Sequence, residues 1–209
     1  MYYIRLESFE YDNTKAPIMK HISVFIGIGL LTALLACQDQ SGSSEEQNLT
    51  EEELMETGAS ITKSVGMTLI KTVQQKMSEG GVESALQFCN ANALNITDSL
   101  SKEHGVRVKR TALKTRNPDN NPTELEKEAL SKMALQQPPQ ASVQMTEDGN
   151  TVYFQPIVLK GFCQTCHGIP GQTMTVQTDS LIKAHYPSDR ATGFSEGDLR
   201  GMWAVYFDE

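Results

Sequence analysis

The fold is decided by residues 141–160, whose sequence is ASVQMTEDGNTVYFQPIVLK. Two runs rich in apolar, β-branched and aromatic residues, 141–145 and 151–160, flank the turn residues 148–150 (DGN), and this pattern predicts a β-hairpin. Pro156 has no backbone N–H to donate to a neighbouring strand, so we expect the second run to lie at a sheet edge or at a bulge.

Further strands and a helix are predicted on both sides of this hairpin. Valine and basic residues alternate in VRVKRTAL (106–113), which predicts an earlier strand, and LRGMWAVYF (199–207) predicts a last one. Between the first strand and the hairpin, Asn121 as N-cap and Pro122 at the first helical position predict a helix to about Leu135.

Two amphipathic helices are predicted ahead of the strands. Apolar residues recur at intervals of seven and four from Glu51 to Met77, and Gly80-Gly81 should end this helix. In a second helix, residues 82–100, apolar residues step by four and three, and Cys89 lies on this stripe, so we expect it to point into the core. Helices followed by antiparallel strands predict an α+β fold.

Composition excludes several classes of protein. The 209 residues include 18 Lys and Arg against 26 Asp and Glu, so the formal net charge is −8, which is unsuited to binding the phosphates of a nucleic acid. With 39% hydrophobic and 21% charged residues, the chain is too apolar for disorder and too polar for a multi-span membrane protein. We expect one soluble domain with an appendage.

The N-terminal region has the features of an export signal. The apolar run 22–36 (ISVFIGIGLLTALLA) is shorter than the about 20 residues that span a bilayer. It ends in LLAC, residues 34–37, which resembles the bacterial lipobox, where the signal peptide is removed before a lipidated cysteine. We therefore expect a lipoprotein signal peptide at residues 19–36 and a lipid on Cys37. The alternative is a plain signal anchor with an incidental cysteine.

This interpretation divides the chain into four parts. Three acids in residues 1–18 are unsuited to the start of a signal peptide, so we expect translation to begin at Met19 and residues 1–18 to be an artefactual extension; the alternative is an unusually long leader. Residues 37–50 are small, polar and acidic, which predicts a flexible tether, and residues 51–209 form the domain. The domain should be lipid-anchored on the periplasmic side of a bacterial membrane.

The chemistry of the chain is concentrated in CQTCH, residues 163–167. Two thiols three residues apart can each form a thioether with a haem vinyl group, so Cys163 and Cys166 are predicted to attach one covalent haem c, with His167 as an axial iron ligand. A thioredoxin-like pair would favour a βαβ setting, a zinc site would need a second ligand pair, and a disulfide would leave His167 without a role.

The sixth iron ligand is not decided by this motif. Cys89 has no disulfide partner once the other cysteines are assigned, and it is either a small buried hydrophobic residue or an iron ligand. The rival ligands are Met174, Met202, His185, His104 and the other methionines.

At this point the chain resembles the PAS-like c-type haem domain family, found in stand-alone bacterial cytochromes and in the exported part of sensor kinases. The resemblance implies a PAS-like antiparallel sheet with an N-terminal helical pair, one covalent haem, and Cys89 as the second axial ligand. It spans nearly the whole predicted domain and is carried by SALQFCN (84–90), VKRTALKTRNPDNNPTELE (108–126), FCQTCHG (162–168) and YPSDRATGFSEGDLRGMWAV (186–205).

A basic run with no acid within it follows the second helix. Some of its members could pair with the haem propionates, since guanidinium groups match carboxylates; the alternative is a solvated strand face. The run comprises Arg107, Lys109, Arg110, Lys114 and Arg116.

The expected function is therefore that of a lipid-anchored monohaem cytochrome with His/Cys ligation, acting in redox or gas sensing with an unidentified redox or signalling partner. The alternative is a periplasmic electron carrier, whose acidic surface would steer a basic partner. A peroxidase would need an open distal site, with His185 or His104 as the distal group, so we expect no enzymatic activity.

Overall fold

A four-stranded antiparallel sheet, with strand order β1-β4-β3-β2, forms the centre of the fold. The structure, a computed structural model, describes residues 49–207; the predicted signal peptide, Cys37 and nearly all of the tether lie outside them. The elements are α1 (Glu51–Ala91), α2 (Ala93–His104), β1 (Arg107–Thr111), η1 (Pro118–Asn120), α3 (Glu124–Ala134), β2 (Ser142–Met145), β3 (Thr151–Val158), η2 (Gly161–Cys163), α4 (Gln164–His167), α5 (Val176–His185) and β4 (Leu199–Tyr206).

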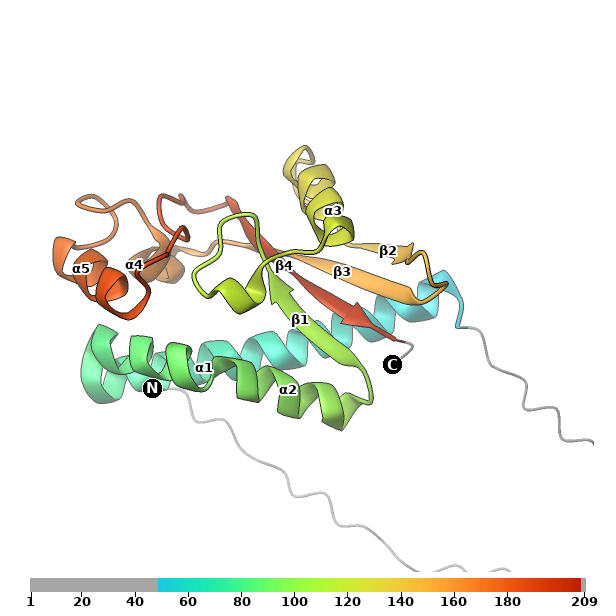
Figure 1. The fold of residues 1–209 in the computed structure, drawn as a ribbon, viewed down its shortest axis with the longest axis horizontal. Helices are drawn as coiled ribbons and strands as arrows, with labels where there is room; N and C mark the ends of the chain where they lie inside the picture. The colour runs from blue at the N-terminus through green and yellow to red at the C-terminus, as the bar shows by residue number, and fades with distance from the viewer. Residues whose placement is uncertain (1–48, 208–209) are drawn as a thin grey trace, which may run out of the picture. The chain divides into compact units, whose positions relative to one another are not determined.

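Helices cover both faces of the sheet (Figure 1). Helices α1 and α2 lie along one face, α3 packs on the other, and α4 and α5 lie beyond one end of the sheet. The predicted α+β class, with N-terminal helices and a small antiparallel sheet, is confirmed. None of the helices within residues 49–207 is long and apolar enough to cross a bilayer.

The side chains of β4 alternate between two apolar cores. Trp203 and Val205 pack with residues of α1 and α2, whereas Met202 and Ala204 pack with α3. Successive side chains of a strand point to opposite faces, so a strand that is buried on both faces needs apolar residues at almost every position. The two edges of β4 are covered as well, because it pairs with β1 on one side and β3 on the other.

The predicted hairpin is confirmed as β2 and β3. The last pair between the two strands is Ser142 with Phe154, so Pro156 lies past the end of β2, where its missing N–H faces no further β2 residue. The register of β3 against β4 then shifts between Ile157 and Val158. The expected edge position of this run is wrong, because β3 lies between β4 and β2, whereas the expected bulge is found next to the proline.

The predicted break between the two N-terminal helices is confirmed at Gly80-Gly81, but a second break at Asn92 was not predicted. Gly80 (φ −154°) and Gly81 (φ 66°) interrupt the helical backbone of α1, as expected. The second helix does not run unbroken to residue 100: Asn92 (φ −127°, ψ −16°) ends α1 and α2 starts after it. A one-residue break preserves the spacing of the apolar stripe, so periodicity did not reveal it.

The start of α3 also differs from the prediction. Thr123, not Asn121, is the N-cap, and it forms a capping box with Glu126. The Glu126 carboxylate is buried and accepts hydrogen bonds from Lys109 Nζ (2.7 Å) and from the Tyr206 hydroxyl (2.8 Å). These contacts with the sheet fix the start of the helix, whereas Asn121 accepts a hydrogen bond from Thr115.

Helix α5 was not predicted from the sequence. Its N-cap is Thr175, whose hydroxyl accepts from the Thr178 backbone N–H, and only Thr178 and Ile182 of the helix are buried. One buried apolar residue makes no stripe, so the only available signal was the cap.

Helix α1 approaches β3 closely at Gly58. A Cβ atom at this position would lie 2.3 Å from Cγ and Cδ1 of the buried Tyr153 ring. We expect Gly58→Ala to lower the free energy of unfolding by about 1–3 kcal/mol, because neither the ring nor the helix has room to move. Denaturant unfolding followed by circular dichroism would measure the change.

Gly66→Ala, on the same helix, is the matched control. Its added Cβ would meet Trp203 Nε1 at 3.7 Å, which is ordinary contact, and alanine favours a helix interior over glycine by about 1 kcal/mol. Equal stabilities of the Gly58 and Gly66 variants would contradict the close approach.

Candidate haem site

A cavity of about 270 Å³ lies between α1, the sheet and the segment that carries the CxxCH motif. Cys89, Cys163, Cys166 and His167 all line it, so the structure brings together the four residues that the sequence predicted for the iron site. Most of its wall from α1 is apolar and comes from both sides of the glycine kink: Leu69, Ile70, Val73, Met77, Ala85 and Leu86.

The CxxCH motif forms a short helical turn directly after β3. The Cys163 backbone N–H donates to Lys160 O (2.9 Å), and the Gly168 N–H donates to Gln164 O (2.8 Å). Both cysteines are half-buried free thiols. Burial raises the pKa of the Cys166 thiol, while Arg116 acts in the opposite direction. The turn presents two thiols, one helical turn apart, to the same cavity.

The imidazole of His167 is held by a backbone carbonyl. Nδ1 lies 2.7 Å from Ala191 O, and a carbonyl can only accept, so Nδ1 carries the proton and Nε2 has the free lone pair. Arg200 Nε is 3.3 Å from the same Nδ1, but two donors cannot bond to each other. Desolvation, together with Arg200 and Arg116, lowers the pKa of His167 well below its ordinary value, which keeps the ring neutral and able to bind a metal.

Three arginines line the cavity, and two of them have no ion-pair partner within residues 49–207. Arg116 pairs with Asp189 (Nε to Oδ1, 3.0 Å). Arg110 lies over the Trp203 ring at 5.8 Å, and Arg200 donates to Lys114 O (3.0 Å). The cavity therefore contains two guanidinium charges that no described carboxylate neutralises, although the whole chain is acidic.

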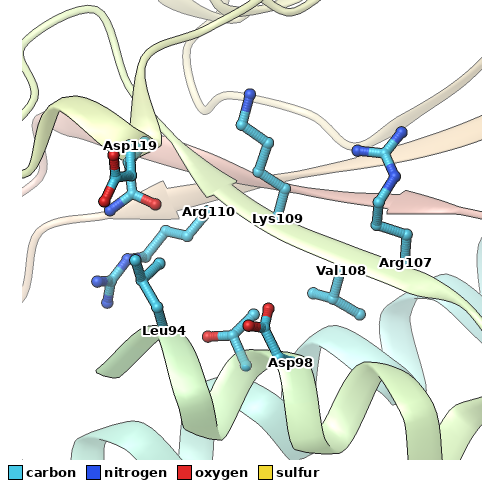
Figure 2. Close-up of a pocket in the computed structure, with 9 residues that line it drawn as sticks. Leu94, Asp98, Arg107, Val108, Lys109, Arg110 and Asp119 are labelled. Carbon is cyan, nitrogen blue, oxygen red and sulfur yellow. The ribbon is translucent and has the colours of Figure 1, made fainter. Parts of the chain in front are cut away.

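A second, more polar hollow of about 230 Å³ lies between α2 and β1 and shares Arg110 with the cavity. Figure 2 shows Val108 directed towards α2, whereas Arg107 and Lys109 point to the other side of the strand. Arg107 stacks on the Tyr206 ring at 3.6 Å, and Lys109 bonds to Glu126. The alternative of one solvated basic face is therefore wrong, because strand alternation divides the run.

Cys89 lies at the cavity wall, which corrects the expectation that it points into the apolar core. It is half-buried, whereas its neighbours Leu86 and Phe88 are buried. Burial raises the pKa of the Cys89 thiol, and Arg110 and Arg116 act to lower it. The next group that lines this wall with a possible ligand atom is the thioether of Met77.

The other rival ligands lie elsewhere. Met202 is buried against α3 on the far face of the sheet, and Met174 packs in a cluster with Ile182 and Tyr186. His104 is exposed at the end of α2, and His185 ends α5. None of these four described residues lines the cavity.

Comparison with known proteins places the chain in a family. The model of the Tll0287-like family matches residues 42–207. The chain belongs to the Tll0287-like family. Among solved structures, it is similar to the crystal structure of the cyanobacterial haem protein Tll0287, at 29% sequence identity and a TM-score of 0.50, covering 75% of this chain and 95% of that one. A comparison with curated proteins finds no match.

The Tll0287-like assignment confirms the family resemblance that the sequence motifs suggested. Four residues at the site were not predicted from composition or spacing. Arg200 and Tyr186 line the cavity, whereas Asp189 and Ala191 contact its lining residues Arg116 and His167. All four lie within residues 186–205. That segment was one of the resembling strings, and this was the only signal for them.

Proposed function

We propose that this chain is a membrane-anchored monohaem c-type cytochrome on the periplasmic side of a bacterial membrane, with His167 and Cys89 as axial ligands, and that it acts in redox or gas sensing. The observation that carries the proposal is the meeting of Cys89, Cys163, Cys166 and His167 at one apolar cavity. Membership in the Tll0287-like family, whose solved relative is a haem protein, supports it.

The charges at the cavity fit the same group. Haem c has two propionates, and the cavity has two guanidiniums, of Arg110 and Arg200, without a described ion-pair partner. A buried charge without a partner is costly, so a ligand with two carboxylates is favoured over a neutral one. We assign these two arginines as the propionate partners.

Each remaining residue has a role in this scheme. Cys163 and Cys166 would form the thioethers, and His167 would present Nε2 to the iron, because Ala191 holds the proton on Nδ1. Haem supplies a reversible one-electron Fe(III)/Fe(II) couple when bound. A Cys89 thiolate would stabilise the ferric state and lower the potential, since axial ligands are the main control on haem.

A sensing role is favoured over enzymatic turnover by the position of the histidines. A peroxidase needs an acid/base group on the distal side, and neither His104 nor His185 lines the cavity. The second candidate function is periplasmic electron transfer, which the net charge of −8 favours because it would steer a basic redox partner. A haem potential matched to a respiratory partner would support this alternative.

Covalent attachment is tested on a denaturing gel. When the chain is exported together with a c-type maturation system, we expect a band near the mature mass to stain for haem peroxidase activity, because thioethers survive denaturation. The double variant Cys163→Ser/Cys166→Ser should lose the stain, whereas Cys89→Ala should keep it. An unstained band from well-exported wild-type protein would exclude a covalent haem.

Cys89 ligation is tested by absorption and electron paramagnetic resonance spectroscopy. We expect a low-spin ferric spectrum of His/thiolate type in the wild type. Cys89→Ala should remove it and leave a high-spin haem, or one that recruits a methionine or water, with a higher potential. The variant should still fold, since a half-buried thiol contributes little volume and no backbone hydrogen bond.

Met77→Leu is the matched control, because Met77 lines the same wall and its replacement changes little volume. It should retain the wild-type spectrum. If instead Cys89→Ala has the wild-type ferric spectrum and Met77→Leu does not, the methionine is the ligand.

Membrane anchoring is proposed to depend on Cys37. A diacylglyceryl group together with an N-linked acyl chain anchors a protein stably, whereas one chain does not. Cys37→Ser should abolish the incorporation of labelled palmitate and block normal maturation, so that the chain keeps its signal peptide and migrates as a larger species on a gel. Wild-type palmitate incorporation in this variant would show that another residue is modified.

A further inference from the structure

Two loops that are far apart in the sequence are joined beside the haem cavity. Residues 115–116 follow β1, and residues 189–191 follow α5. The Arg190 backbone N–H donates to Thr115 O (3.0 Å), and Arg116 pairs with Asp189. The side chains of this pair are only 11% and 4% exposed, respectively, so both charged groups are largely shielded from water.

The Arg116–Asp189 pair continues to His167 through the backbone. Asp189 Oδ1 also accepts from the Ala191 N–H (3.1 Å), and Ala191 O accepts from His167 Nδ1–H (2.7 Å). On its other side, Arg116 Nη2 donates to Cys166 O (2.6 Å). Arg116 is thus bonded to the turn that carries the CxxCH motif and, through Asp189, to the peptide segment that orients the imidazole.

Stability alone is a poor explanation for this arrangement. Replacing a buried ion pair by apolar residues of similar volume is often neutral or stabilising, because desolvation offsets the attraction between the charges. Arg116 also differs from Arg110 and Arg200, since its Nε and Nη2 already donate to Asp189 and to Cys166 O. A role in geometry is therefore favoured over a role as a propionate partner.

We propose that Arg116 and Asp189 are positioning residues that hold the Ala191 carbonyl against His167 Nδ1 and so set the strength of Nε2 as an iron ligand. The proposal rests on the proposed haem site and goes beyond its ligand set. A hydrogen bond from Nδ1–H to a carbonyl raises the basicity of a ligating histidine, and loss of its support weakens electron donation and raises the haem potential.

The decisive variant is Arg116→Lys in the full, haem-loaded chain. Lysine keeps the positive charge, so a simple electrostatic effect on the haem is small, but its single ammonium group cannot reproduce the planar fork that bonds to Asp189 and Cys166 together. Hydrogen–deuterium exchange of the His167 Nδ1 proton, followed by ¹⁵N-edited proton NMR, should become about fivefold faster, as expected for the net loss of one hydrogen bond.

Two further measurements accompany it. The midpoint potential of Arg116→Lys should rise, and its low-spin ferric paramagnetic resonance signal should broaden or split, because the imidazole is no longer held in one orientation. Asp189→Ala removes the acceptor of both Arg116 and Ala191 and should show larger changes of the same kind. Asp179→Ala, which breaks the more exposed Lys183–Asp179 pair on α5, is the control and should leave all three quantities unchanged.

The outcomes separate this inference from the proposed function. Wild-type proton exchange, potential and signal shape in Arg116→Lys, in a protein that stains for covalent haem, would overturn the positioning role and leave the cytochrome intact. If Asp189→Ala does not fold, the measurements on Arg116→Lys are sufficient to test the positioning role. A wild-type chain that never acquires haem would overturn the proposed function and this inference together.

Discussion

The burial of β4 on both faces is the constraint on which the rest of the fold depends. β4 pairs with β1 on one edge and with β3 on the other. Its alternating side chains contribute to the core under α3 on one face and to the core under α1 on the other. The same strand places Arg200 and Gly201 at the cavity while Met202, one residue on, faces away from it. A register shift of one residue would exchange these faces and dismantle the site.

Much of the fold could be predicted because its signals are local. The hairpin has a turn of defined composition between two apolar runs, and the paired glycines interrupt α1 at the position that the sequence indicated. The errors came from a tertiary contact in one place and from weak periodicity in two others. Glu126 moves the start of α3 to Thr123 because Lys109 and Tyr206 bind its carboxylate. Asn92 interrupts a helix without disturbing the apolar spacing, and α5 buries too little to show a pattern.

The candidate site was partly predictable for a similar reason. The CxxCH motif is a local signature, and Cys89 stood out because it lacked a partner. The direction of Cys89 was wrong, since the apolar stripe describes a helix that faces both a core and a cavity, and the sequence does not distinguish them. The basic run could not be divided without its strand register, which sends Arg110 to the cavity and Lys109 to Glu126. Asp189 contacts Arg116 through its carboxylate and Ala191 contacts His167 through its backbone carbonyl, and only their place in a resembling segment indicated them.

The break at Gly80 and Gly81 divides α1 into two helical segments. The first part is anchored to the sheet by Val65 and Leu69, whereas the part after Gly81 carries Cys89. Because the backbone at Gly80 and Gly81 is not helical, the two parts do not share one axis, and the second part packs through Leu86 against Ile182 and Tyr186. The break at these glycines, and not one continuous helical axis, thus sets the direction from which the Cys89 thiol meets the cavity.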